Sequence, residues 1–294
     1  MCMEKNFCLT KKIDFFSPEK IMNSGEIFRM YKDAETGIFR VFSGDKVLFL
    51  KETGKDSFGF SCSSEEFENY WSRFFDLETD YSGLYKKALK SGPYIAGCAA
   101  SSYGIRVLNQ DLFEMMISFI ISQQKRIPEI RKCIEALCAR FGEKKVVKGY
   151  EYYAFPEAKA IADAGPEGVK GLSLGYRERY IYETALKYVA DDFIKSSEFR
   201  ALSFEEAKAC LKQYCGIGEK VANCICLFAL GYKDAFPIDV HIKDILHREY
   251  SVGDDNYRTL SDAVFTNAVN ERFADFAGAK GIIQQWIFAK EIAK

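Results

Sequence analysis

The first 90 residues alternate apolar and polar side chains in short runs that predict β-strands. The segment 38–52, "IFRVFSGDKVLFLKE", contains two such runs around residues 43–45, a pattern typical of a β-hairpin. The segments 27–31 and 58–62 are further strand candidates. A helix is expected to begin at the serine pair 63–64, because two glutamates follow in its first turn.

From about residue 110 onward the apolar residues recur three and four positions apart, which predicts helices. The expected helices are 112–124 capped by Asp111, 128–141 with Pro128 in the first turn and Gly142 at its end, 177–192, 204–214 with a Ser203–Glu206 capping box, 219–230 ended by Gly231, 240–250 capped by Asp239, and 281–294. The change of period predicts an α+β protein. An N-terminal antiparallel β-sheet domain over 1–100 precedes a larger all-helical domain over 101–294.

Composition narrows the class of protein without selecting a function. The chain has 294 residues, of which 48% are hydrophobic and 28% charged, as in an ordinary globular protein. No apolar run approaches the ~20 residues of a membrane helix, and the N-terminus lacks the apolar core of a signal peptide. We therefore expect a cytoplasmic protein. The net charge of −1 lacks the basic excess that is typical of nucleic-acid-binding proteins, but a local basic groove would be enough to bind DNA.

The ten cysteines are expected to be reduced thiols. Several of them lie within helical patterns, where cysteine behaves as a small buried hydrophobe. No Cys-x-x-Cys pair is present, and the last cysteine is Cys226. A zinc ribbon or an iron–sulfur cluster near the C-terminus is therefore excluded, and we expect no metal.

The stretch "CGIGEK", 215–220, joins two predicted helices through Gly216 and Gly218 and predicts a helix–hairpin–helix. Its glycines permit positive φ, and the amides that open the second helix suit a phosphate. A Walker loop and a dinucleotide fingerprint do not fit, since no Gly-Lys-Ser/Thr ending and no preceding strand are present. Taken alone, a Gly-x-Gly turn is as well explained by a tight connection between helices.

Lys220 and Asp239 are the candidate catalytic residues. Lys220 lies in the first turn of a helix, where the helix dipole disfavours its charge, and an uncharged amine is a nucleophile. Asp239 follows nineteen residues later and could stabilise positive charge on a sugar, although it would also favour the charged lysine. The alternative is a solvated helix lysine and a plain N-cap aspartate.

At this point the chain resembles a known family. The segment 211–246, "LKQYCGIGEKVANCICLFALGYKDAFPIDVHIKDIL", is similar to the helix–hairpin–helix–Gly/Pro–Asp motif of base-excision DNA glycosylases, and most of all to that of the 8-oxoguanine DNA glycosylases. The segments 104–142, 174–180, 281–288 and 24–30 resemble the same family. The likeness thus spans nearly the whole chain, and it implies a TBP-like fold for the N-terminal domain.

The resemblance implies a bifunctional glycosylase and strand-cleaving lyase. Lys220 would attack the anomeric carbon of the sugar and form a Schiff base that supports β-elimination, while Asp239 would stabilise the charged sugar. Relatives that remove adenine or alkylated bases lack this lysine and only hydrolyse. The expected partner is double-stranded DNA with an oxidised guanine. The protein is expected to act as a monomer without a cofactor, at the nucleoid if it is prokaryotic.

The resemblance also implies a pocket for a flipped base. 8-Oxoguanine carries a hydrogen-bond donor at N7, and the carbonyl of Gly25 matches the acceptor that reads it. Gln284 matches the glutamine at the Watson–Crick edge, although its neighbour Gln285 leaves room for a slip of one residue. Phe288 and Cys224 match the groups on the two faces of the base. Without the motif, both would be ordinary helix core residues.

Four further residues match positions that hold the DNA. Tyr176 and the adjacent Arg177 match the wedge on the strand opposite the lesion, and Gln124 falls where a polar side chain fills the gap. His241 matches a histidine near the lesion phosphate. The alternatives are a locally packed turn tyrosine, a solvated helix-end glutamine and a structural histidine.

One departure concerns the base opposite the lesion. The arginine that reads cytosine in this family falls at Glu129, and a carboxylate cannot replace that bidentate donor. We therefore expect cleavage with little preference for the opposing base. Two other functions stay open at this point. One is an endonuclease III-type glycosylase for oxidised pyrimidines, which usually ends in a four-cysteine cluster, and the other is a non-catalytic DNA-binding module.

Overall fold

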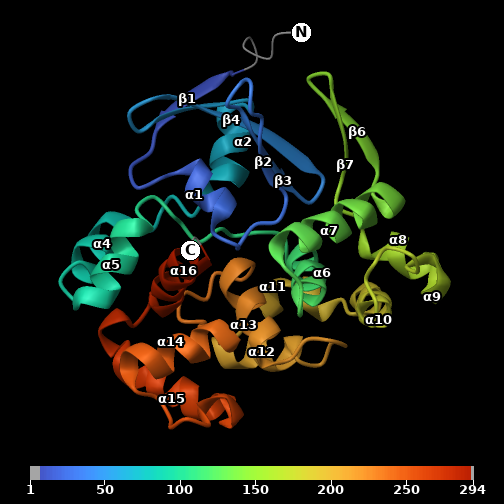
Figure 1. Cartoon of the computed structure of the whole chain (residues 1–294). Coiled ribbons are helices and arrows are strands. Elements are labelled where there is room, and N and C mark those ends of the chain that lie inside the picture. The colour runs from blue at the N-terminus through green and yellow to red at the C-terminus, as the bar shows by residue number, and fades with distance from the viewer. Residues whose placement is uncertain (1–6, 293–294) are drawn as a thin grey trace.

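A computed structural model describes residues 7–292, and within them the N-terminal part is a five-stranded antiparallel sheet (Figure 1). The strand order is β1-β5-β4-β3-β2. The strands are β1 (Leu9–Lys12), β2 (Met30–Lys32), β3 (Phe39–Ser43), β4 (Lys46–Gly54) and β5 (Ser57–Phe60). The predicted hairpin is confirmed, since β3 and β4 pair from Phe39↔Leu50 to Ser43↔Lys46. Strand β1, which pairs with β5, was not predicted.

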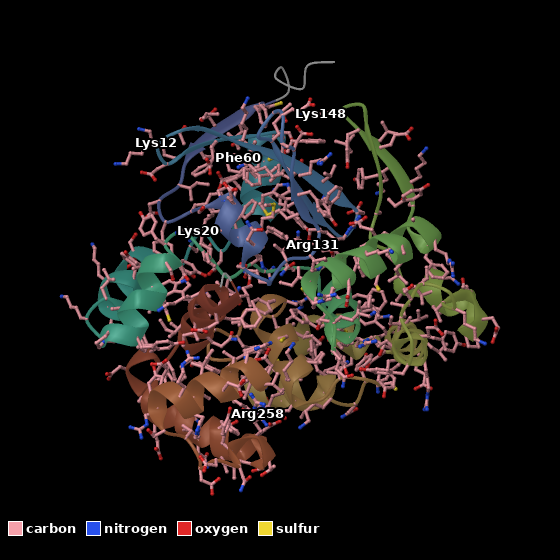
Figure 2. The ribbon with its side chains drawn as sticks, viewed as in Figure 1. Lys12, Lys20, Phe60, Arg131, Lys148 and Arg258 are labelled. Carbon is pink, nitrogen blue, oxygen red and sulfur yellow. The ribbon has the colours of Figure 1, made fainter. Side chains whose placement is uncertain are left out.

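Short helices cover one face of this sheet. They are α1 (Pro18–Asn23), α2 (Ser64–Glu66), the π-helical turn η2 (Phe67–Trp71) and α3 (Ser72–Phe74). The helix start at 63–64 is confirmed, because the Ser63 side chain accepts the Glu66 amide hydrogen. The core between the layers is rich in aromatic residues, and Figure 2 shows Phe60 within it while Lys12 and Lys148 lie at the periphery.

The rest of the chain is mainly helical, which confirms the α+β class. The helices are α4 (Tyr81–Ala88), α5 (Pro93–Ser101), α6 (Leu112–Ser122), α7 (Ile127–Phe141), α8 (Ala158–Asp163), α9 (Gly165–Gly168), α10 (Arg177–Ala190), η3 (Phe193–Lys195), α11 (Ser197–Arg200), α12 (Phe204–Leu211), α13 (Glu219–Phe228), α14 (Val240–Tyr250), η4 (Tyr257–Thr259), α15 (Asp262–Arg272), η5 (Ala274–Phe276) and α16 (Lys280–Ile292). The predicted caps are confirmed: Asp111 and Asp239 accept amide hydrogens, and Ser203 forms its capping box with Glu206.

Two segments cross between the sheet and the helical part. The hairpin of β6 (Lys144–Val147) and β7 (Tyr150–Tyr153) follows α7 but packs on the sheet, where the ring centroids of Tyr152 and Phe42 lie 5.5 Å apart (Figure 1). This hairpin was not predicted from the sequence. Conversely, α4 and α5 end by Ser101 but pack with the helices, and α5 contacts α16. The packing therefore groups these two helices with the C-terminal part, and the boundary at residue 100 stays a prediction.

Candidate active site

The two glycines of the hairpin between α12 and α13 have different surroundings. Gly216 has a φ of +80°, and a Cβ added there would lie 2.6 Å from Cδ2 of Tyr180, so no larger residue fits. Gly218 is the N-cap of α13 with extended backbone, and a Cβ there would meet no atom within 4 Å. The exposed space at Gly218 leaves room for a second molecule beside the first turn of α13.

Lys220 is the second residue of α13 and is half-buried. Its Nζ lies 5.3 Å from the ring centroid of Phe119 on α6, a neighbour that the sequence did not indicate. Cys224 follows one turn later and is 2% exposed. Burial raises the pKa of the Cys224 thiol; the Lys220 ammonium opposes this rise and the Asp239 carboxylate adds to it. The amine, the thiol and the carboxylate therefore lie close enough to influence one another.

Asp239 occupies the N-cap of α14. One of its carboxylate oxygens accepts the amide hydrogen of Ile242 at 2.9 Å, which fixes the side chain at the start of the helix. No ion pair among residues 7–292 joins Asp239 to Lys220. Both groups are half-buried, so a substrate can still approach them. The structure thus brings the two candidate catalytic residues to neighbouring helix starts without pairing them.

Gly25 lies against Phe288, although the two residues are at opposite ends of the chain. A Cβ added to Gly25 would lie 2.9 Å from Cε1 of Phe288, and its φ is +84°. The aromatic ring of Phe288 is half-buried. The loop after α1 and the C-terminal helix α16 therefore meet at the residues expected to hold a base.

The neighbouring glutamines of α16 have different environments. Gln285 is 1% exposed, and its Nε2 donates to the carbonyl of Ser24 at 3.0 Å. Gln284 is 4% exposed, and its buried Oε1 has no hydrogen-bond partner in the described chain. A buried amide oxygen without a partner is costly unless a ligand or water supplies a donor. The geometry therefore favours Gln284 as the ligand-facing residue and gives Gln285 a structural role.

The candidates for filling the gap in DNA lie on two adjoining loops. Gln124 is exposed with a φ of +52°, directly after α6, and Tyr176 is 49% exposed at the start of α10. Arg177 differs from the expectation of a DNA contact. Its guanidinium is stacked 4.4 Å from the Tyr176 ring centroid, is 5% exposed, and donates to the carbonyls of Leu174 and Gln123. Arg177 is therefore buried beneath the two loops and links them through these hydrogen bonds.

These loops are also tied to the hairpin. Gln123 donates from Nε2 to the carbonyl of Gly216 at 2.9 Å. Tyr180 packs against Gly216 on one side, and its ring centroid lies 5.6 Å from that of Tyr176. Three segments that are far apart in sequence thus form one surface. Gln123 and Tyr180 were not predicted as site residues, because nothing in their local pattern distinguishes them from other polar or aromatic helix residues.

The two other candidates are exposed. His241 lies in the first turn of α14, two residues after Asp239, so its ring can reach an approaching phosphate. Glu129 lies in the first turn of α7 and forms an ion pair with Arg126, with Nη2 and Oε1 3.0 Å apart. Because Arg126 bonds the carboxylate, the pKa of Glu129 is lowered.

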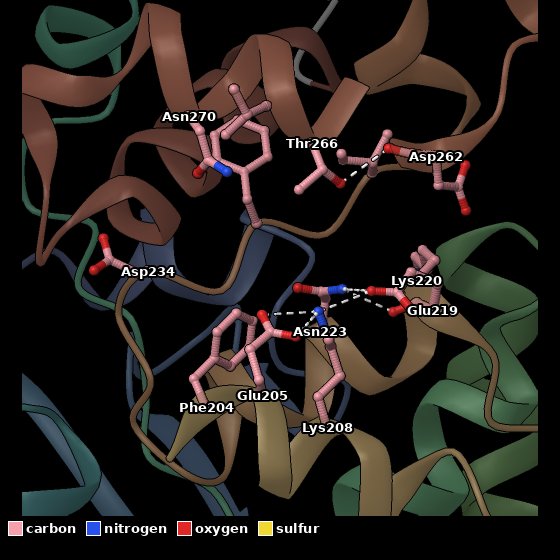
Figure 3. Close-up of a pocket in the computed structure, with 13 residues that line it drawn as sticks. Phe204, Glu205, Lys208, Glu219, Lys220, Asn223, Asp234, Asp262, Thr266 and Asn270 are labelled. Carbon is pink, nitrogen blue, oxygen red and sulfur yellow. Dashed lines mark hydrogen bonds and ion pairs between the residues drawn. The ribbon is translucent and has the colours of Figure 1, made fainter. Parts of the chain in front are cut away.

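A polar pocket of about 80 Å³ lies beside the start of α13 (Figure 3). It is bounded by α12, α13, α15 and the segment 234–238, and Figure 3 shows Lys208 between Glu205 and Glu219 at its edge. Of the predicted site residues only Lys220 lines it. The pocket is therefore separate from the residues around Gly25.

Residues 7–292 contain no cluster of histidine, cysteine and carboxylate side chains that could hold a metal ion. Among the same residues, no helix combines the length and apolar character needed to cross a bilayer.

Two family models match the chain. Residues 117–268 match the HhH-GPD superfamily of base excision DNA repair proteins, so the chain belongs to that superfamily. Residues 8–116 match the N-terminal domain of 8-oxoguanine DNA glycosylase, which identifies the chain as an 8-oxoguanine glycosylase-type member. The resemblance inferred from the motifs is confirmed.

Individual proteins support the same assignment. The chain is 34% identical over 163 residues to the N-glycosylase/DNA lyase of Saccharomyces cerevisiae, covering 52% of this chain and 43% of the yeast protein. It is 27% identical over 231 residues to the N-glycosylase/DNA lyase OGG1 of Arabidopsis thaliana, covering 76% and 63%. The matches thus span less than two thirds of either relative.

Solved structures match over the whole fold. The 8-oxoguanine glycosylase/lyase of Clostridium acetobutylicum in its apo form superimposes with a TM-score of 0.85 at 29% identity, covering 97% of this chain and 99% of that one. The same enzyme with double-stranded DNA containing cytosine opposite 8-oxoguanine gives 0.86, with coverage of 97% and 98%. The 3-methyladenine DNA-glycosylase of Archaeoglobus fulgidus, at 21% identity and a TM-score of 0.74, shares the fold.

Proposed function

We propose that this chain is a bifunctional DNA glycosylase and strand-cleaving lyase that removes 8-oxoguanine from duplex DNA in base-excision repair. The observation that carries this proposal is the half-buried Lys220 in the first turn of α13. The charges of Lys220 and Asp239 both affect the pKa of the Cys224 thiol, so the three groups lie near one another. The relatives named N-glycosylase/DNA lyase support it. We further propose that the chain works as a monomer in the cytoplasm, at the nucleoid in a prokaryote, without a cofactor.

The chemistry begins at the Lys220 amine. A bond forms between Nζ in its neutral form and C1′ of the deoxyribose, and the bond between C1′ and N9 of the base breaks. Opening of the sugar ring then gives a protonated imine between the lysine and C1′. The base leaves as an anion and takes up, through water, the proton that is lost from C2′. The C3′–O bond then breaks, the 3′ phosphate leaves, and the strand is cleaved. Asp239 stabilises the positive charge that develops on the sugar.

The base would leave the duplex and enter the space between Gly25, Phe288 and Cys224. The Phe288 ring and the Cys224 side chain suit the two faces of a flat base, and Gln284 offers a buried amide oxygen without a partner. Gly25 would accept the N7 hydrogen that guanine lacks. Flipping leaves a gap that Gln124 and Tyr176 would fill, while His241 and the amides beyond Gly216 and Gly218 hold the backbone phosphates.

We also propose weak selectivity for the opposing base. Glu129 offers no donor at the position expected to read cytosine, and Arg126 is engaged with its carboxylate. Excision from four duplexes that differ only in the opposing base should therefore differ by less than about tenfold. A steep preference for cytosine would contradict this part of the proposal.

Borohydride trapping on a duplex with one 8-oxoguanine tests the lysine chemistry. The wild type should form a covalent adduct, and Lys220→Gln should form none, with strand cleavage reduced at least about a thousandfold because the nucleophile is gone. Lys212→Gln is the matched control. This exposed hairpin lysine pairs with Glu219 at 2.7 Å and should keep the adduct.

Two other results would favour the alternative functions. An adduct with an oxidised pyrimidine but none with 8-oxoguanine would move the substrate to that of an endonuclease III-type enzyme. Full biological activity of Lys220→Gln would instead favour a DNA-binding module without catalysis.

A further inference from the structure

The carboxyl group of Glu26 is buried directly beside Gly25. Glu26 is fully buried, with Oε1 3.1 Å from Oγ of Ser24 and Oε2 accepting the amide hydrogen of Leu108 at 3.1 Å. No ion pair among residues 7–292 involves it. A buried carboxylate without a cation is strongly disfavoured. Burial raises the pKa of Glu26 from 4.5 to about 8; the hydrogen bonds from Leu108 and Ser24 oppose this rise, and the negative Asp76 adds to it.

The hydrogen bonds of Ser24 show where a proton on Glu26 would go. The Ser24 hydroxyl has one hydrogen but two neighbouring oxygens, the Ile21 carbonyl at 2.8 Å and Oε1 of Glu26 at 3.1 Å. If Ser24 donates to Ile21, the closer oxygen, then its Oγ can accept from a protonated Glu26. A neutral Glu26 thus satisfies all three groups. An ionised Glu26 would compete with Ile21 for the single hydroxyl hydrogen.

The backbone on both sides of Gly25 is held by distant elements. The Ser24 carbonyl accepts from Gln285 of α16, and the Glu26 carbonyl accepts from Nε2 of Gln110 at 2.9 Å. The backbone N–H of Gln110 in turn donates to the carbonyl of Phe228, the last residue of α13. Within the described chain the Gly25 carbonyl itself accepts no hydrogen bond. This carbonyl is the one acceptor of the three that is left for a ligand.

The charged groups around Glu26 do not supply a counterion. Asp76 forms an ion pair with Lys233 at 3.0 Å and accepts from the hydroxyl of Tyr81. Tyr81 also accepts the Val107 amide hydrogen. Burial raises the pKa of Tyr81, so its hydroxyl stays neutral. From α16, the side chains of Gln285, Phe288 and Ile292 contact residues 24–25, and none of them is charged. The buried Arg106 pairs with Asp14 and donates to the carbonyls of Asp14, Phe15 and Asp76, and no hydrogen bond or ion pair in the described chain joins it to Glu26. Removing the proton from Glu26 would therefore leave a negative charge with no opposing one.

We propose that Glu26 is a positioning residue for base recognition: its protonated carboxyl holds the Ser24–Gly25 segment so that the Gly25 carbonyl faces the base, and its ionisation releases that segment. The inference rests on the proposed function, because it concerns how the flipped base is read. It adds a pH-dependent control of recognition that is separate from the chemistry at Lys220.

The test compares wild type with Glu26→Gln across pH. A glutamine keeps both hydrogen bonds, since its amide nitrogen can donate to Ser24 and its oxygen can accept from Leu108, but it cannot ionise. The readout is the single-turnover rate of base excision from an 8-oxoguanine duplex. Strand cleavage at a preformed abasic site is measured in parallel, because that substrate has no base to read.

The ratio of variant to wild-type excision should be about 1 at about pH 7 and rise to about 10 at about pH 9, because one pH unit above its pKa leaves Glu26 about one tenth protonated. The same ratio for abasic-site cleavage should stay near 1. A flat ratio for excision, or an equal rise on both substrates, would overturn the proposal. If the wild type excises no 8-oxoguanine at about pH 7, the proposed function itself fails and this inference fails with it.

Glu114→Gln is the matched control. Glu114 of α6 is a second buried carboxyl; burial raises its pKa to about 7, and it accepts the Gly44 amide hydrogen at the turn between β3 and β4, with no hydrogen bond to the segment 24–26 in the described chain. Both carboxyls bind a proton more tightly in the folded chain, so each lowers the free energy of unfolding as pH rises from about 4.5 to its folded pKa. Both variants should flatten that fall in urea titrations, but only Glu26→Gln should alter the excision ratio. A ratio altered equally by Glu114→Gln would overturn the proposal.

Discussion

The residues that would perform the chemistry and those that would read the base are positioned in different ways. Lys220 and Asp239 each owe their place to a helix start, defined by the N-cap Gly218 or by the Asp239 side chain itself. The segment 24–26 is instead held by Leu108, Gln110 and Gln285, which are 82, 84 and 261 residues away. Reactive groups can thus be placed by local sequence, whereas recognition here depends on contacts that only the complete fold provides.

The largest expected effect separates charge from capping at Asp239. Asp239→Asn should keep the cap, because asparagine caps helices about as well as aspartate, but should lower base excision about 10²- to 10³-fold by removing the negative charge. Single-turnover kinetics and thermal unfolding check the two halves of this prediction. Asp111→Asn, at the N-cap of α6, should change neither measurement appreciably. Equal losses in both variants would show that capping, and not charge, matters.

Next in size is Gly25→Ala. The added Cβ would meet Phe288 at 2.9 Å, so base excision should fall about ten- to a hundredfold, or about 1–3 kcal/mol, while abasic-site cleavage changes little. Gly37→Ala is the control, since Gly37 also has a positive φ of +70° but open space around it. Both variants share a backbone strain of about 1–2 kcal/mol. A similar loss of excision in Gly37→Ala would point to instability as the cause.

The paired glutamines of α16 offer a sharper comparison. Gln284→Ala should lower excision about tenfold with little change in stability, because its Oε1 is unpaired in the free chain. Gln285→Ala should lower the free energy of unfolding by about 1–3 kcal/mol, because it leaves the buried Ser24 carbonyl without its donor. Kinetics and urea titrations on both variants check the assignment, and a reversed pattern would exchange the two roles.

The last comparison concerns stability alone, at the two hairpin glycines. Gly216→Ala should lower the free energy of unfolding by about 2 kcal/mol or more, through strain at positive φ and contact with Tyr180. Gly218→Ala should change it by no more than about 1 kcal/mol, because the site is open and extended. Thermal unfolding of the two variants measures the difference, and equal losses would contradict this account of the turn.

Local patterns predicted the helices α6, α7, α10, α12, α13, α14 and α16, but not α4, α5, α8 or α15. The caps at Asp111, Ser203 and Asp239 are interactions within four residues, so the sequence contains everything needed to form them. Strand β1 was missed because its four residues, "LTKK", carry one apolar side chain and pair with residues that are 45 to 51 positions away. The hairpin of β6 and β7 was missed because its lysines mask an alternation that becomes apolar only at the tyrosines of β7.

The roles of the site residues stay predictions, but the structure shows orientations that the sequence did not indicate. The family resemblance indicated a DNA contact for Arg177, yet its guanidinium is buried and donates to the carbonyls of Leu174 and Gln123. Likewise, no sequence pattern could tell Gln284 from Gln285, since both are buried and the difference is one distant carbonyl. Glu26 carried no signal at all, because a glutamate after a glycine is normally solvated.

The exchange of β6–β7 and α4–α5 between the two parts of the chain has a consequence for how DNA would be engaged. Each part holds a piece of the other, so neither can swing on a simple hinge (Figure 1). We therefore expect the distance between Gly25 and Lys220 to stay the same when DNA binds. We expect the motion needed to bring a damaged nucleotide between them to come from the duplex, which must bend and open to fit the protein.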